Sequence, residues 1–431
     1  MFKTNFIIVW AGQVISVFGS NLSGFALGVW LYQRTGSASN FALVALCTVL
    51  PQVLLSPLAG VWIDRHNRRW TMALADTGAA LCTLCLAVLF FSGHIQVWHI
   101  FLATAISSAF SSLQVPAYTA LVASTTAHGQ LGRVNGLLQL GRGLADILAP
   151  GIAGVLVVTI GVPGVLLVDL LTFCAAVLTL IFVRFPGLEE ARPPSQDESS
   201  VKTSWWSELQ AGWRMLAAQP ALSTLLRYQV LFTFLWSLFG VLVTPMVLGF
   251  ATPDELGAAL TVAGIGLLSG SLLMTAWGGP KRRVWGLLFF ELLSALAFCL
   301  MGLRPSLALV AGAAFLAHFT LAFVSSLAEA IWQGQVPHAL QGRIFAFKQT
   351  ALKLGTFCAY LAASLLADRF LEPLLRSDGL LACSLGPRFG TGPGRGLAFL
   401  FFLIGLLKAA SVLWIYAAPG LRRLDSDLSR Q

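Results

Sequence analysis

Long apolar stretches recur along almost the whole chain and constrain its fold more than any other feature. A helix needs about 20 mostly apolar residues to cross the hydrocarbon core of a bilayer, and twelve stretches meet that length. They lie at about residues 6–32, 40–63, 70–92, 98–123, 133–158 and 161–184, then 225–250, 257–277, 284–303, 307–332, 343–366 and 396–418. Because the backbone finds no water partners inside a bilayer, each stretch is predicted to span it as an α-helix.

The composition agrees with this prediction. Of the 431 residues, 57% are hydrophobic and 10% are charged, whereas a soluble domain carries about 25% charged residues. The net charge of +9 is distributed between the apolar stretches and forms no single basic patch, which argues against nucleic-acid binding. We therefore predict an all-α polytopic membrane protein surrounded by the lipid bilayer.

The predicted helices fall into two groups of six. Residues 1–184 form the N-terminal half and residues 225–418 the C-terminal half, with a connector at 185–224 and a tail at 419–431. The connector is first polar and Pro-rich. It then places Trp205, Trp206, Leu209, Trp213 and Leu216 at helical spacing, which predicts a helix in the cytoplasmic interface.

Basic residues in the short loops predict the orientation. The loops after the second and eighth stretches each carry three Lys or Arg residues, and those after the third, fifth and seventh carry none. The positive-inside rule then places both termini in the cytoplasm. The long loop 367–395 carries four arginines and runs against this trend without reversing it.

An internal repeat relates the two halves. Arg68-Arg69 recurs as Arg282-Arg283, and Gly132-Arg133 recurs as Gly342-Arg343, at offsets of 214 and 210 residues. A near-constant offset predicts two parallel six-helix repeats, a plan found in secondary transporters.

The loop between the second and third stretches carries a known signature. It resembles the Gly-x-x-x-Asp-Arg-x-x-Arg-Arg motif of the major facilitator superfamily, matched by Gly60, Asp64, Arg65, Arg68 and Arg69. The residue at 67, a glycine in the family, is an asparagine, which also tolerates a left-handed turn. Further stretches, such as Gly12-Gln13-x-x-Ser16 and Gly390–Gly396, look like the drug-exporter branch that includes macrolide efflux proteins.

The resemblance implies a cytoplasmic gate. Asp64 is expected near the N-terminus of the helix that begins around Gly342-Arg343, where amides and the helix dipole favour a carboxylate. Glu329 is expected to close a gate ion pair near Arg282-Arg283. The competing interpretation is that these charges only set the topology. The residues assigned to the gate are Gly60, Asp64, Arg65, Arg68, Arg69, Arg343 and Glu329.

The fifth stretch carries part of the antiporter signature of the same superfamily. Gly136, Pro150 and Gly154 match its spacing, while alanines replace other expected glycines. Small residues still permit close helix packing, so the partial match favours export.

Ionisable residues inside the stretches are candidates for proton coupling, because they are costly in a membrane. Arg142 and Asp146 are i,i+4 neighbours, so they can pair on one helix face. That pair would either serve coupling or substrate binding, or merely stabilise the helix. Asp76 and Glu291 are further candidates, but for these two capping or anchoring of nearby basic loops is the favoured interpretation.

The resemblance also implies a substrate cavity between the first, fourth, seventh and tenth helices. The polar and aromatic candidates on these helices are Asn21, Gln114, Thr233, Trp236 and His318. Few fixed charges and many aromatic residues suit a bulky amphiphilic substrate. No nucleotide loop, zinc motif or nucleophile elbow is found, so we expect neither an enzyme nor a cofactor or metal.

Three functions remain open at this point. The favoured one is proton-coupled export of a lipophilic drug or secondary metabolite, macrolide-like or peptide-like, by alternating access, with a monomer sufficient for transport. The expected location is the plasma membrane (the inner membrane of a bacterium). The alternatives are an importer of the same fold and a membrane scaffold or assembly partner that transports nothing.

Overall fold

The structure, a computed structural model, describes residues 2–125, 131–183, 220–336, 341–376, 378–379 and 381–417. For Gly60, Asp64, Arg65 and Arg343 it describes only the backbone, which is helical. The predicted interfacial helix over 205–216 and the tail at 419–431 lie outside the described residues.

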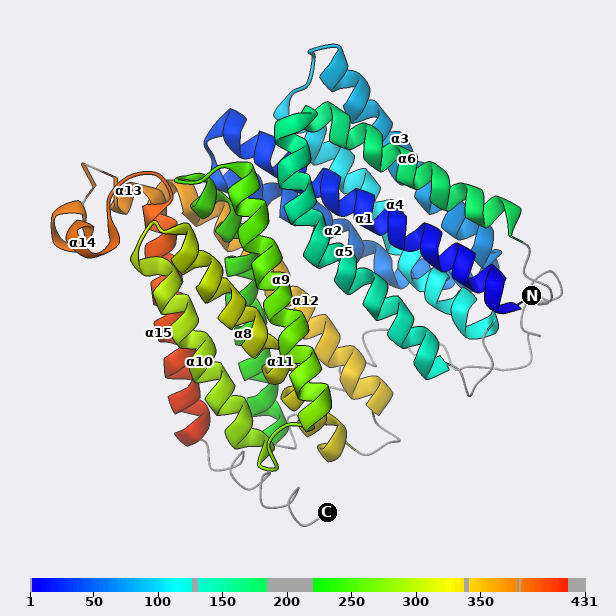
Figure 1. Cartoon of the computed structure of the whole chain (residues 1–431). Coiled ribbons are helices and arrows are strands. Elements are labelled where there is room, and N and C mark those ends of the chain that lie inside the picture. Colours follow the sequence, from blue (N-terminus) through cyan, green and yellow to red (C-terminus); the bar gives the residue numbers. More distant parts are fainter. Residues whose placement is uncertain are drawn as a thin grey trace. The chain divides into compact units, whose positions relative to one another are not determined.

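Twelve helices in the described ranges are long and apolar enough to cross a membrane, which confirms the predicted fold class. The first six are α1 (Phe2–Thr35), α2 (Ala38–Arg65), α3 (Arg68–Phe91), α4 (Val97–Thr125), α5 (Leu131–Thr159) and α6 (Gly161–Phe182). The other six are α8 (Pro220–Leu248), α9 (Pro253–Trp277), α10 (Arg283–Leu303), α11 (Leu307–Gln335), α12 (Gln341–Leu366) and α15 (Arg395–Ala417). Figure 1 shows these helices, and each overlaps one predicted stretch.

The structure extends several helices beyond the apolar stretches that predicted them. The prediction for α8 starts at residue 225, but the helix begins at Pro220, because proline is well suited to the first helical turn. Residues 367–395, expected to be a loop, contain a π-helical turn η3 (Ala367–Leu371) and the short helices α13 (Glu372–Leu374) and α14 (Ala382–Phe389). Elements this short leave no clear periodicity in a sequence.

The chain divides into two compact units, Met1–Ser199 with Pro253–Ala258, and Ser200–Thr252 with Ala259–Gln431. In the first unit α1 lies against α5 and α6, and α4 lies against α2 and α3 (Figure 1). One buried apolar cluster around Val9, Met72 and Leu121 and another around Leu22, Leu86 and Val165 form its core.

Two glycines bring α1 and α6 into close contact. A Cβ added at Gly12 would lie 2.6 Å from the Thr179 hydroxyl, and a Cβ at Gly19 would collide with Thr172. The two glycines are seven residues apart, as are the two threonines, and they pair in opposite order, so the helices run antiparallel. We call these four residues the α1–α6 seam. Small residues of this kind permit close backbone approach in membranes, where packing rather than the hydrophobic effect holds helices together.

The second unit has its own core. Its α10 lies against α11 and α15, and α8 lies against α12 (Figure 1). A buried cluster around Leu287, Phe323 and Trp332 joins α8, α10 and α11. Gly266 and Gly270 of α9 would each place a Cβ against the backbone carbonyl of Phe315 or Phe319 on α11. This is the Gly-x-x-x-Gly form of close helix packing.

In the turn between α2 and α3, the backbone at Asn67 differs from the left-handed conformation that the family's glycine implies. Asn67 has φ −65° and ψ 120°, so it does not take the left-handed conformation that the asparagine tolerates. Its side-chain oxygen accepts a hydrogen bond of 3.0 Å from the Arg69 backbone N–H and so caps the N-terminus of α3. Asparagine serves here as a helix cap and not as a substitute for glycine.

Candidate functional site

A cavity of about 230 Å³ in the first unit gathers several of the predicted residues. It is lined by residues of α1, α4 and α5. It brings Gln114, a predicted cavity residue, together with Arg142 and Asp146, the predicted candidates for proton coupling. Trp10 and Val17 add apolar surface. We call this the α1/α4/α5 cavity.

Asp146 is the exposed carboxylate of this cavity, and its partner comes from α1. Asn21 donates a hydrogen bond of 2.8 Å from Nδ2 to Asp146 Oδ1. No ion pair joins Asp146 to Arg142 in the described chain, although their i,i+4 spacing allows one. A tertiary donor has taken the place of the i,i+4 neighbour, and both charged groups are left available to the cavity.

A second carboxylate lies behind the cavity wall. Asp76 of α3 is 1% exposed and accepts hydrogen bonds from Gln13 Nε2 at 2.8 Å and from Gln114 Nε2 at 2.7 Å. Gln114 Nε2 also lies 2.8 Å from Gln13 Oε1 and donates to it. Asp76 therefore binds two glutamines that line the cavity, and the expected role of anchoring a basic loop is wrong.

Two residues of this cavity were not selected from the sequence. Gln13 appeared there only as part of a family motif, although a glutamine inside a predicted span is an unusual polar group. Tyr118 is 8% exposed, and its hydroxyl has no hydrogen-bond partner among the described residues. It lines the cavity beside Arg142. The cavity thus presents a carboxylate, a guanidinium, a phenol and amides on an apolar and aromatic wall.

In the second unit the predicted cavity residues include an aromatic cluster on α8 and α11. The rings of Trp236 and His318 lie 5.1 Å apart, and Trp236 also packs on Phe232 and Phe239. His318 Nδ1 lies 2.9 Å from the Ala314 carbonyl oxygen of its own helix. Thr233 is half-buried on α8. The cluster supplies a large apolar surface whose polar atoms are the indole nitrogen of Trp236 and the two imidazole nitrogens of His318.

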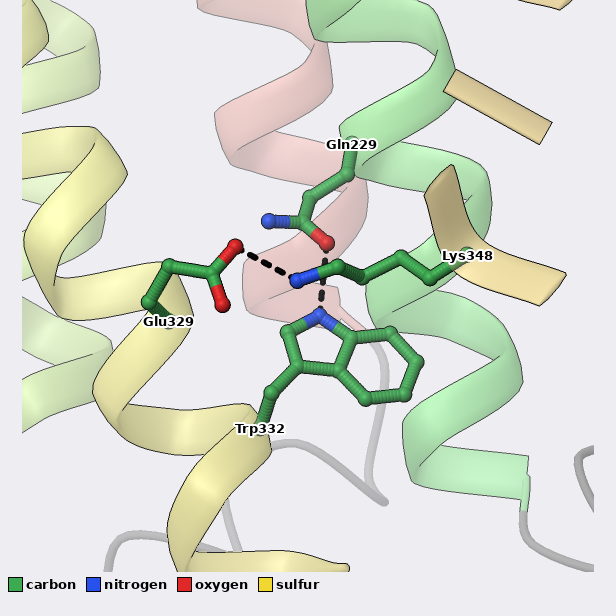
Figure 2. A network of polar contacts seen from close by, with 4 residues as sticks. All are labelled: Gln229, Glu329, Trp332 and Lys348. Carbon is green, nitrogen blue, oxygen red and sulfur yellow. Dashed lines mark hydrogen bonds and ion pairs between the residues drawn. The ribbon is translucent and has the colours of Figure 1, made fainter. Parts of the chain in front are cut away.

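Glu329 has a different partner from the one expected. Its Oε1 lies 2.5 Å from Lys348 Nζ of α12, and Figure 2 draws this pair. Arg283 instead donates a hydrogen bond of 3.0 Å to the Ala330 carbonyl oxygen, next to Glu329 in the chain. Lys348 is 1% exposed, whereas the Glu329 side chain is 45% exposed. In the same network Trp332 Nε1 donates a hydrogen bond of 2.6 Å to Gln229 Oε1 (Figure 2). The Glu329 pair therefore joins α11 to α12.

Glu291 pairs with Lys408, a residue that no sequence motif points to. Lys408 Nζ of α15 lies 2.8 Å from Glu291 Oε1 of α10, and both side chains are 1% exposed. The same ammonium lies 4.4 Å from the centre of the Phe232 ring. Glu291 therefore does not anchor a basic loop. A lysine in the middle of the last apolar stretch was the signal that could have found this pair.

The gate residues are described only in part. Arg69 Nε and Nη2 donate to the carbonyl oxygens of Leu180 and Ile181 at 2.5 and 2.6 Å. These carbonyls end α6, where a cation satisfies free acceptors and the negative end of the helix dipole. Arg68 lies in the first turn of α3. The structure does not describe the side chains of Asp64, Arg65 and Arg343. The residues of the partial antiporter signature, Gly136, Pro150 and Gly154, lie on α5.

Known proteins resemble the chain over most of its length. Macrolide efflux protein A of Streptococcus pyogenes is 25% identical over 371 residues, covering 85% of this chain and 90% of that protein. Multidrug efflux pump Tap of Mycolicibacterium fortuitum is 24% identical over 322 residues, covering 73% of this chain and 78% of the pump.

Solved structures share the fold. The inward-facing crystal structure of a bacterial homologue of the iron transporter ferroportin matches with a TM-score of 0.67 and 16% identity, over 100% of both chains. The nucleoside transporter NupG matches with a TM-score of 0.68 and 10% identity, over 96% of this chain and 99% of that one. At such identities the likeness concerns the fold alone.

The family is settled by a match to the sequence pattern of the Major Facilitator Superfamily over residues 9–251, more than half of the chain. The twelve spanning helices and the Gly60–Arg69 loop agree with that match. The chain is a multi-pass membrane transporter that belongs to the Major Facilitator Superfamily.

Proposed function

We propose that this transporter exports a lipophilic, amine-bearing drug or secondary metabolite in exchange for protons. The observation that carries the proposal is the exposed Asp146 carboxylate in the α1/α4/α5 cavity, held by Asn21 and free of an ion pair in the described chain. An unpaired carboxylate inside a membrane domain has two ready ligands, a proton and a cationic group of a substrate. If these two ligands compete for Asp146, entry of one releases the other.

The rest of the cavity suits a large amphiphile. Trp10, Val17 and Leu138 provide apolar contact, while Tyr118 and Arg142 offer hydrogen bonds to substrate oxygens. The names of the macrolide and multidrug efflux relatives support export and this substrate class. Asp76, whose oxygens bind Gln13 and Gln114, is the second candidate for proton coupling, because a proton on Asp76 would change how both cavity glutamines are held.

Transport into inverted membrane vesicles under an imposed pH gradient tests the proposal. A panel of lipophilic antibiotics and peptide metabolites should include compounds that accumulate only with the gradient. Asp146→Asn should abolish that accumulation, whereas Asp378→Asn, a change of an exposed carboxylate outside the spanning helices, should leave it intact. Gradient-driven accumulation that survives in Asp146→Asn would remove Asp146 from the mechanism. No accumulation of any compound by the folded protein would favour the scaffold alternative, and efflux from the vesicles would favour import.

We also propose the gate that the family motif implies. In this proposal the transporter lies in the plasma membrane with both termini in the cytoplasm. Asp64 stabilises the outward-facing state from the cytoplasmic side. Asp64→Asn should increase the labelling of cysteines placed in the α1/α4/α5 cavity by a cytoplasmic reagent. Unchanged labelling would leave the charges of this loop with a role in topology alone.

A further inference from the structure

A second cavity in the first unit is separate from the one that the proposed function uses. It has a volume of about 220 Å³ and is lined from α1, α2, α3, α4 and α6. Liquid water occupies about 30 Å³ per molecule, so the cavity has room for an ion with several waters. We call this the α6 cavity, because its one carboxylate is Asp169 of α6.

Asp169 is buried without a compensating cation. It is 2% exposed, and the residues that line the α6 cavity include no lysine, arginine or histidine. Its Oδ2 accepts a hydrogen bond of 3.3 Å from Thr83 Oγ1, but its Oδ1 has no hydrogen-bond partner in the described part of the chain. A buried carboxylate without a cation is costly even when hydroxyl groups surround it. A bound positive charge would remove that cost.

Three hydroxyl groups of the cavity wall use their protons in bonds to backbone carbonyls. Thr48 donates its hydroxyl proton to the Val44 carbonyl, Ser108 to the Thr48 carbonyl and Ser111 to the Ser107 carbonyl. Each hydroxyl oxygen keeps lone pairs once its proton is used in this way. Ser23 is 5% exposed, and its hydroxyl group lies close enough to the Asp169 carboxylate to interact with it, but its oxygen has no hydrogen bond of ordinary geometry among the described residues.

Hard cations prefer oxygen ligands, and most polar groups of the α6 cavity are hydroxyls, with Cys82 and Gln52 also in its lining. Because the α6 cavity has a single carboxylate, it favours an ion with a single positive charge. A divalent ion would leave one positive charge uncompensated in a medium of low dielectric constant, and such ions are usually held by more than one carboxylate. No group of three His, Cys, Asp or Glu residues with metal-binding geometry occurs in the described ranges.

We propose that the α6 cavity binds a monovalent alkali-metal cation, with Asp169 Oδ1 and the Ser23 hydroxyl as direct ligands and further hydroxyl oxygens and waters completing the shell. The site does not depend on the proposed export of drugs. Gly19 contributes to it as well: a Cβ there would lie 2.9 Å from Asp169 Oδ1, so the glycine leaves room for the carboxylate beside α1.

Equilibrium binding of radiolabelled Na⁺, and of Rb⁺ as a substitute for K⁺, to the full chain in lipid nanodiscs tests the proposal. Choline chloride keeps the ionic strength constant. We expect saturable binding of one ion per chain, at least tenfold weaker binding in Asp169→Asn, and a raised thermal midpoint in the presence of the ion that binds. Asp76→Asn is the matched control, since it also neutralises a buried acid of this unit but lies outside the α6 cavity, so it should keep the binding.

Several results would overturn the proposal. Wild-type protein without saturable binding of either ion would do so, as would equal binding by Asp169→Asn. Stabilisation that follows pH alone, with no response to Na⁺ or K⁺, would assign the carboxylate to a proton. If Asp169→Asn does not fold, Ser23→Ala combined with Thr83→Val keeps the carboxylate and removes two oxygens, and unchanged ion affinity in that folded variant would also overturn the site. Loss of ion binding with intact drug transport would leave the proposed export standing.

Discussion

Lys408 of α15 and Glu291 of α10 form an ion pair of 2.8 Å in which each side chain is only 1% exposed. Neither group can turn to water when the other is removed. A buried pair of this kind is a small net source of stability, because the desolvation of both charges offsets their attraction. Removal of one partner alone is far more costly, because the other charge then stays buried without a counter-ion.

Lys408→Met should destabilise the transporter by about 3–5 kcal/mol, because the Glu291 carboxylate then stays buried without a cation. The double variant Lys408→Met with Glu291→Leu should recover most of the loss. Thermal unfolding of the two single variants and the double variant in one detergent measures the coupling. A double variant as unstable as the sum of the two single variants would show that the pair has no energetic coupling.

Removal of Glu329 and removal of Lys348 should destabilise the protein by different amounts. Glu329→Gln leaves a lysine that is 1% exposed, while Lys348→Met leaves a glutamate that is 45% exposed and can reach water. We therefore expect Glu329→Gln to lower the thermal midpoint more than Lys348→Met does. The rings of Trp332 and Phe345, 5.5 and 5.1 Å from the ammonium, reduce the difference without removing it. Equal shifts would contradict this account of the pair.

Arg69 should stabilise the protein by binding the carbonyl groups at the C-terminus of α6. Arg69→Ala removes two hydrogen bonds to the carbonyls of Leu180 and Ile181 and a charge at the helix C-terminus, a loss of about 1–3 kcal/mol. Arg304→Ala changes an exposed arginine that follows the C-terminus of α10, and it serves as the control. The measurement is the thermal midpoint of each variant. An unaltered midpoint for Arg69→Ala, with altered cysteine accessibility, would assign Arg69 to the gate alone.

Asn21 should act on transport through Asp146. Asn21→Leu removes the donor that holds the carboxylate and should raise the apparent KM for the exported compound about twofold to tenfold, the equivalent of one hydrogen bond. Asn40→Leu on α2 is the matched control and should leave the KM unchanged. The assay is the vesicle uptake described above. An unchanged KM in Asn21→Leu would show that Asp146 needs no positioning by α1.

Hydropathy was sufficient to predict the helices, because a membrane leaves a chain few other ways to satisfy its backbone. It could not assign side-chain partners. Arg142 and Asp146 have the spacing of a helical pair, but Asn21, 125 residues earlier, is the residue that bonds to Asp146. Long-range partners of this kind depend on how helices are rotated about their axes, and a single sequence does not encode that rotation in any local pattern.

The same limit explains the other differences. Asp76 and Glu291 lie near basic loops in the sequence, yet their partners are glutamines and a lysine on other helices. Lys408 drew no attention because one lysine hardly changes the hydropathy of a long apolar stretch. The local rule that ionisable groups in a membrane are costly identified the right acids, and the packing of the helices then decided which groups neutralise them.

The α1–α6 seam has a consequence for how this transporter could acquire new substrates. Positions 12 and 19 accept no residue larger than glycine without displacing α6, so the backbone of α1 is held in place just before Asn21. The opposite wall, with Val115 of α4 and Leu138 of α5, has no such restriction and offers apolar side chains of adjustable size. Under selection by an unfamiliar compound, adaptive substitutions should therefore accumulate on α4 and α5, while α1 remains the invariant side of the cavity.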